Sequence, residues 1–167
     1  MKFYKLFICS FLLFFASPAL AEKFSYKAKI LRVLDGDTIV VRSNQKEIRI
    51  RLCGIDAPES KQEHGGWSKM LLQKMLNHTN GVIDVHVMDT DRYGRQIASL
   101  RSSNVSFNVK MVEYGGAWVY EKYAGNCWNR EQIRQVNSFM NNAKNRRLGL
   151  WENERPVQPW LWRRQNK

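Results

Sequence analysis

The chain has 167 residues, a length typical of one domain with an ordinary core, and no internal repeat or low-complexity segment divides it. With 27 Lys and Arg against 15 Asp and Glu, its formal net charge of +12 favours polyanionic partners, but charge alone does not separate binding from mere solubility. The three histidines, His64, His78 and His86, have no paired spacing with a cysteine, which argues against a zinc ligand set.

The first 21 residues have the three parts of a secretory signal peptide. A short basic start, "MKFYK", is followed by the apolar run "LFICSFLLFFA" at 6–16 and the small residues "ALA" at 19–21. This order predicts cleavage after Ala21 and export to the periplasm or the medium. A membrane anchor is the alternative, but a span needs about 20 apolar residues and this run is shorter. Cleavage removes two lysines and no acids, so the mature chain, 22–167, has 25 basic and 15 acidic residues, a net charge of +10.

Five segments of the mature chain have the alternating pattern of half-buried strands. In "EIRIRLC", for example, Ile48, Ile50 and Leu52 alternate with two arginines and a cysteine, so one face is predicted to enter the core. The turn sequences "DGDT" and "DRYGR" separate some of these strands. The predicted strands cover about 24–34, 38–43, 47–53, 82–88 and 96–101.

Apolar residues recur at helical spacing in three further places. Glycine or Asn-Gly pairs follow each of them, as is common where helices end. The predicted helices cover about 67–76, 106–114 and 129–147. The tail, "RPVQPWLWRRQNK", contains two prolines, two tryptophans and several basic residues. The sequence leaves open whether this tail packs on the body or extends away from it.

Five short strands with inserted and appended helices predict a small α+β protein. An open sheet would leave two exposed edges, so closure into a barrel is favoured. We therefore expect a five-stranded Greek-key barrel of the oligonucleotide-binding type. It would form a single domain over 22–167, with its core at about 27–152 and a short basic and aromatic C-terminal tail.

Two cysteines remain after signal cleavage. Cys9 leaves with the signal peptide, whereas Cys53 and Cys127 stay in a compartment that permits disulfides. An even pair in an exported chain predicts one bridge between them. Such a bridge would tie the third predicted strand to the start of the last helix.

Carboxylates and arginines alternate at the turns of the predicted barrel. Asp37, Asp56 and Glu59 follow strands, and Arg51 and Arg95 lie near them in the same motifs. A hard divalent cation prefers oxygen ligands, and guanidinium groups bind phosphate oxygens in a forked geometry. A carboxylate beside them could activate water. Taken singly, each motif is more simply a turn, but together they indicate a site for a metal and a phosphate.

Four motifs taken together are specific to one family. They are "VLDGDTIVV" at 33–41, "IRLCGIDAPE" at 50–59, "TDRYGR" at 90–95 and "YGGAWVY" at 114–120, with a weaker likeness in "LGLW" at 148–151. On these motifs the chain resembles the staphylococcal nuclease (thermonuclease) family, including its exported bacterial members. The resemblance extends from about Lys29 to Trp151, nearly the whole mature chain.

This resemblance implies a five-stranded oligonucleotide-binding barrel with three helices and a calcium-dependent phosphodiesterase activity. Members cut DNA and RNA and leave 3′-phosphate ends. On the family pattern Arg51, Glu59 and Arg95 match the catalytic positions. The implied Ca²⁺ ligands are the carboxylates of Asp37 and Asp56 and the backbone carbonyl of Ala57, where better-known members carry threonine.

Further positions match residues that contact the substrate in the family. Arg92, Tyr93, Trp118 and Tyr120 stand where the family places phosphate-binding and base-stacking side chains, although core packing is the alternative for the last two. Asp35 matches a family aspartate that is not a direct ligand. Aromatic rings beside basic groups bind single-stranded bases without strong sequence preference, so single-stranded or frayed DNA and RNA are the expected substrates.

The predicted function is a secreted calcium-dependent nuclease of low sequence specificity, with no membrane association after signal cleavage and a monomeric state. The alternative is a catalytically inactive module that binds single-stranded nucleic acid. Inactive members typically lose the arginine or glutamate positions, whereas Arg51, Glu59 and Arg95 are all present here. A cationic adhesion protein would explain the charge and export but not the motifs.

Overall fold

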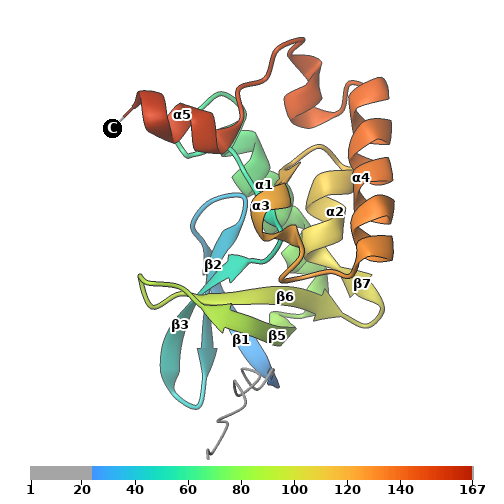
Figure 1. The fold of residues 1–167 in the computed structure, drawn as a ribbon. Helices are drawn as coiled ribbons and strands as arrows, with labels where there is room; N and C mark the ends of the chain where they lie inside the picture. Colours follow the sequence, from blue (N-terminus) through green and yellow to red (C-terminus); the bar gives the residue numbers. More distant parts are fainter. Residues whose placement is uncertain (1–23, 167) are drawn as a thin grey trace, which may run out of the picture.

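The computed structural model describes residues 24–166, and a closed five-stranded barrel forms its centre (Figure 1). The strands lie in the order β3-β2-β1-β5-β6, and β3 pairs again with β6 to close the sheet. This closing pair is parallel, with Arg51 opposite Ile97, whereas the other pairs of the barrel are antiparallel. The strands are β1 Ser25–Val33, β2 Thr38–Ser43, β3 Lys46–Leu52, β5 Val82–Thr90 and β6 Gln96–Ser102.

The core of the barrel comes from the alternation that the sequence shows. Ile50 and Leu52 of β3 are buried, as are Val85 of β5 and Leu100 of β6, whereas the residues between them are more exposed. Register shifts interrupt the β1–β2 and β5–β6 ladders. Such irregularities increase local bend and twist, which helps five short strands to close. The predicted oligonucleotide-binding barrel is therefore confirmed.

Helices cover one side and one end of the barrel (Figure 1). The three predicted helices are present, and α4 begins with a capping box in which Asn129 and Gln132 exchange side-chain and backbone hydrogen bonds. They are α1 Gly65–Leu76, α2 Phe107–Glu113 and α4 Arg130–Asn145. The structure adds short elements, namely β4 Ile55–Asp56, β7 Val105–Ser106, β8 Trp118–Val119, α3 Glu121–Ala124 and α5 Pro159–Gln165, and 3₁₀ turns at Asn77–Thr79 and Gly149–Glu152.

The C-terminal tail packs back on the body and ends in helix α5. Pro159 occupies the first turn, where its missing N–H costs nothing, and it is buried. In Figure 1 this helix lies across the segment that leads from β4 to α1. The sequence left the position of the tail open, and the structure places it at the end of the barrel where the predicted site lies.

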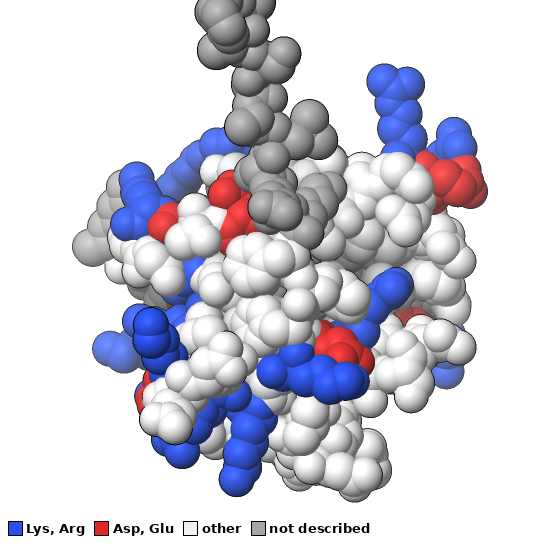
Figure 2. All heavy atoms as spheres, turned by 90° about the horizontal axis from the view of Figure 1, so that it is seen from below, with Lys and Arg blue, Asp and Glu red and all other residues white. Residues whose placement is uncertain are grey.

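Surface charge is dispersed on the barrel end opposite α5. Figure 2 shows Lys and Arg at several separate places on this face, with Asp or Glu beside some of them. In the β2–β3 hairpin, Glu47 lies 3.2 Å from both Arg32 and Arg42. Exposed ion pairs of this kind contribute about 0–1 kcal/mol each to stability.

The predicted signal peptide lies outside the described residues, and so does its cleavage site after Ala21. Within residues 24–166, every helix is too short or too polar to cross a bilayer.

Candidate active site

The turn between β1 and β2 holds an aspartate in a buried position. The Asp37 backbone N–H donates to the Asp35 carboxylate over 2.9 Å, and the Thr38 hydroxyl donates to Asp37 Oδ1 over 3.1 Å. Gly36 packs so closely on α1 that an added Cβ would lie 1.9 Å from Ser68 Oγ. The turn is thereby pressed against the helix, and Asp37 is left only 5 % exposed.

Arg51, near the end of β3, links two aspartates that are 19 positions apart in the sequence. Its Nη1 atom lies 2.5 Å from Asp37 Oδ2, and its Nη2 atom donates to Asp56 Oδ1 over 2.6 Å. Gly54, with φ of +78°, makes the tight turn that brings Asp56 of β4 back beside β3. Asp37 Oδ2 also accepts the Ala57 N–H over 2.7 Å, so the residue after Asp56 joins the cluster.

The contact between Arg51 and Asp37 is an ion pair without hydrogen-bond alignment. Among the described residues, Arg51 Nη1 is buried and has no hydrogen-bond partner, despite its short distance to the carboxylate. This nitrogen therefore keeps N–H donor capacity that a ligand could use. Phosphate oxygens are natural partners for an arginine fork.

Glu59 follows in the loop before α1. Its backbone N–H donates to Gln62 Oε1 over 3.2 Å, and its carbonyl accepts the Gln62 N–H over 2.8 Å. Gly65 passes so near that a Cβ there would lie 2.0 Å from the Glu59 carbonyl oxygen. These contacts fix the loop while the Glu59 side chain stays about one-third exposed, at 35 %.

A residue that the sequence analysis missed completes this cluster. Arg163 of α5 donates from Nη2 to Asp56 Oδ2 over 2.7 Å and from Nη1 to Asp56 Oδ1 over 3.2 Å. The same Nη1 donates to Glu59 Oε1 over 2.7 Å. Helical spacing is the one sequence feature that bears on Arg163, because this residue lies three positions after Trp160 and therefore shares a helix face with it. Nothing local, however, distinguishes it from the exposed Arg164.

Negative charge exceeds positive charge at this cluster. The carboxylates of Asp35, Asp37, Asp56 and Glu59 meet only two guanidinium groups, those of Arg51 and Arg163. Burial raises the pKa of Asp37 above its ordinary value. Arg51 opposes this effect, whereas the charges of Asp35 and Asp56 strengthen it. The two guanidinium groups therefore do not balance the four carboxyl groups of this cluster.

This donor set fits a hard divalent cation. Asp37 and Asp56 offer carboxylate oxygens around one arginine, and their excess charge is what such an ion neutralises. No set of three or more His, Cys, Asp or Glu side chains within residues 24–166 is arranged to hold a metal. A cation here would accordingly use the two carboxylates with backbone oxygen and water.

Arg95 lies in the β5–β6 turn, directly before the strand that pairs with β3. Asp91 holds it, because Oδ2 accepts from Arg95 Nε over 2.8 Å and Oδ1 accepts its backbone N–H over 3.0 Å. The neighbouring Tyr93 is 68 % exposed, and the Arg92 guanidinium lies 4.8 Å from its ring centroid. Among the described residues no ion pair connects Arg95 to Asp37, Asp56 or Glu59.

Aromatic rings border the cluster on another side. Trp118 of β8 lies opposite Asp56 in the β4–β8 pair, and Tyr120 follows it. The Trp160 ring of α5 stacks on Tyr120 with centroids 5.2 Å apart and lies edge-on to Trp118 at 5.9 Å. Tyr120 and Trp118 are each half-buried, so the structure places them beside the site with part of each ring covered.

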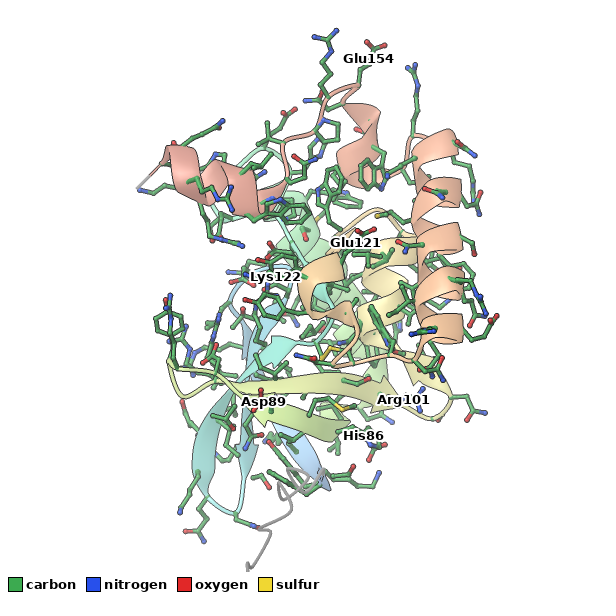
Figure 3. All side chains as sticks on the ribbon, viewed as in Figure 1. His86, Asp89, Arg101, Glu121, Lys122 and Glu154 are labelled. Atoms are coloured by element: carbon green, nitrogen blue, oxygen red, sulfur yellow. A yellow bond between two sulfur atoms is a disulfide. The ribbon has the colours of Figure 1, made fainter. Side chains whose placement is uncertain are left out.

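A disulfide anchors the strand that carries Arg51. Cys53 and Cys127 are bonded, with Cα atoms 5.8 Å apart, and Cys53 is buried. Beside this disulfide, a hollow lined by Cys127, His86, Arg101 and Trp128 lies under α4. The labelled His86 and Arg101 in Figure 3 show how far this hollow lies from α5.

Comparison with known proteins gives one consistent result. The family model described as staphylococcal nuclease homologue matches residues 49–153. A protein of Escherichia coli O157:H7 named as an uncharacterized endonuclease is 39 % identical over 136 residues, covering 81 % of this chain and 83 % of that protein. A micrococcal nuclease of Shigella flexneri is 33 % identical over 159 residues, covering 90 % of this chain and 86 % of that protein. The chain belongs to the staphylococcal nuclease family.

Proposed function

We propose that the mature protein, 22–167, is an exported, calcium-dependent nuclease. It hydrolyses phosphodiester bonds of DNA and RNA with low sequence specificity and leaves 3′-phosphate ends. The observation that carries this proposal is the cluster at one end of the barrel in which Arg51 binds Asp37 and Asp56 while Arg163 binds Asp56 and Glu59. Family membership makes a nuclease the activity to expect from such a cluster.

The proposed cation is Ca²⁺, held by the carboxylates of Asp37 and Asp56 and by the Ala57 carbonyl. When bound, it would supply positive charge for the phosphate and make water more acidic. The excess of carboxylate over guanidinium groups in the pocket supports a divalent ion there. The carbonyl ligand depends only on the backbone, so alanine suits this position as well as threonine.

Glu59, Arg51 and Arg95 would have separate roles in the hydrolysis step. Glu59, partly exposed, would accept a proton from the water whose oxygen attacks phosphorus. Arg51 would bind a non-bridging oxygen through Nη1, which is ion-paired with Asp37 but makes no aligned hydrogen bond, as negative charge develops there. The bond from phosphorus to the 5′ oxygen then breaks. Arg95 would stabilise that departing oxygen if the β5–β6 turn brings it against the substrate.

Partly uncovered aromatic faces near the site support a preference for single-stranded or frayed substrates. The exposed ring of Tyr93 and the half-covered ring of Tyr120 offer faces for nucleobases, and Arg92 lies beside the first. Stacking of this kind is worth about 1–3 kcal/mol per base and tolerates any sequence. We further propose that the exported protein acts as a monomer without membrane attachment.

Digestion of heat-denatured DNA by the purified mature protein tests the proposal. Wild type is compared with Glu59→Gln in calcium and in excess chelator. Glu63→Gln is the matched control, because it lies in the same loop and is exposed. We expect cutting that requires calcium, falls about 10²–10³-fold in Glu59→Gln and is unchanged in the control.

Two results would contradict the proposal. Undiminished cutting in chelator would exclude dependence on a divalent cation. Tight binding of the denatured DNA without cleavage, in calcium, would instead identify an inactive nucleic-acid-binding module. End-labelling of the products would separately test for 3′-phosphate ends.

A further inference from the structure

Arg163 occupies the oxygens that a cation at Asp56 would need. Asp56 is fully buried, and both of its oxygens accept from the Arg163 guanidinium. Asp56 Oδ1 also accepts from Arg51, so guanidinium donors already contact both oxygens of this carboxylate. A metal ion and the Arg163 guanidinium therefore compete for the same carboxylate.

The same helix also covers a ring that the proposed substrate would use. Trp160 stacks on Tyr120 with an interplanar angle of 4°, which is the arrangement a nucleobase would take on that ring. Arg163 additionally binds the proposed base, Glu59, over 2.7 Å. One short helix thus contacts the proposed metal ligand, the proposed base and an aromatic face. Figure 3 shows side chains filling the space between α5 and the end of the barrel.

We propose that α5 is an autoinhibitory latch, in which Arg163 takes the place of a divalent cation at Asp56 and Trp160 covers the stacking face of Tyr120. The inference rests on the proposed function, because it assigns Asp56 to the metal and Tyr120 to the substrate. Opening of the latch exposes both positions together. The free enzyme then needs more calcium than its ligand set alone would require.

The way in which α5 is attached to the barrel is compatible with its movement. The helix has only seven residues, and the Arg163 side chain is 39 % exposed. The segment before it is tied to the loop after Glu59, since Gln62 donates to the Val157 carbonyl over 2.6 Å. With that bond and the buried Pro159 kept in place, residues 160–165 can move away while the chain stays anchored at Val157.

Calcium titration by calorimetry, without nucleic acid, tests the latch. Arg163→Gln removes the competing charge, and Arg164→Gln is the control with the same charge change at an exposed neighbour. If the latch is closed nine-tenths of the time, apparent calcium affinity in Arg163→Gln rises about tenfold. Trp160→Ala, which keeps Arg163 but removes the ring that stacks on Tyr120, should also bind calcium more tightly.

Hydrogen exchange provides a second measurement on the unaltered protein. Calcium should accelerate exchange of the α5 amides, because the helix loses its contact with Asp56. Equal or weaker calcium binding by Arg163→Gln, with wild-type binding intact, overturns the latch and leaves the nuclease proposal standing. If Arg163→Gln binds calcium normally but loses cutting, Arg163 contacts the substrate instead, which also overturns the latch. A wild-type protein that binds no calcium overturns the proposed metal dependence itself.

Discussion

Removal of the disulfide between Cys53 and Cys127 should lower the free energy of unfolding by about 4 kcal/mol. The two cysteines are 74 positions apart, so the bond closes a long loop in the unfolded chain. In the chain-entropy model, a loop of this length gives about 4.4 kcal/mol at 25 °C. Cys127→Ser is the preferred change, because Cys127 is half-buried whereas Cys53 is fully buried.

Urea unfolding followed by circular dichroism measures this loss. The slope of free energy against urea should also rise, because an uncrosslinked chain exposes more surface when it unfolds. Wild type in excess reductant serves as the control, and it should match Cys127→Ser, on which reductant has no effect. A change below about 1 kcal/mol, outside the 2–5 kcal/mol typical of native disulfides, would refute the reasoning. Two reactive thiols in denatured, unreduced protein would show that the bridge is absent.

Three further substitutions test the packing and the positioning around the site. Asn108→Ala removes three buried hydrogen bonds to backbone groups and should cost about 2–4 kcal/mol in chemical denaturation. Gly36→Ala should cost about 1–3 kcal/mol in the same assay, because its Cβ would meet α1, whereas Gly66→Ala, with nothing within 4 Å, should not destabilise. Asp91→Asn removes the carboxylate that holds Arg95 and should lower kcat about tenfold with little change in melting temperature.

The sequence predicts the barrel well because the signal for each strand is local. Alternation in β3, for instance, fixes which residues are buried, and Ile50 and Leu52 are indeed inside. The α4 helix is similarly local, since its capping box lies within four consecutive residues. The two-residue strands β4 and β8 could not be predicted this way. Their pairing of Asp56 with Trp118 joins segments 62 positions apart and is set by the tertiary fold.

The motif residues of the site were identifiable, but their partners were not. Asp37, Arg51 and Asp56 form one contact group, as their positions in the family motifs suggest. The hydrogen bond from Arg95 to Asp91 lies within one turn sequence and is also a local feature. Arg163 is different, because its contact with Asp56 joins residues 107 positions apart and depends on where the C-terminal tail packs against the barrel. Periodicity gives the face of a short helix but not the surface it meets.

The sign of the charge at the site connects these observations. The chain carries a formal net charge of +12, yet the cluster around Asp56 has more carboxylate than guanidinium groups. A polyanion attracted by the protein as a whole would therefore meet local repulsion where the chemistry should occur. Exchange of Arg163 for a divalent cation raises the charge beside Asp56 by one unit, and it frees a guanidinium group. The same exchange that admits the cation thus makes the pocket more attractive to phosphate, so metal and substrate should favour each other's binding.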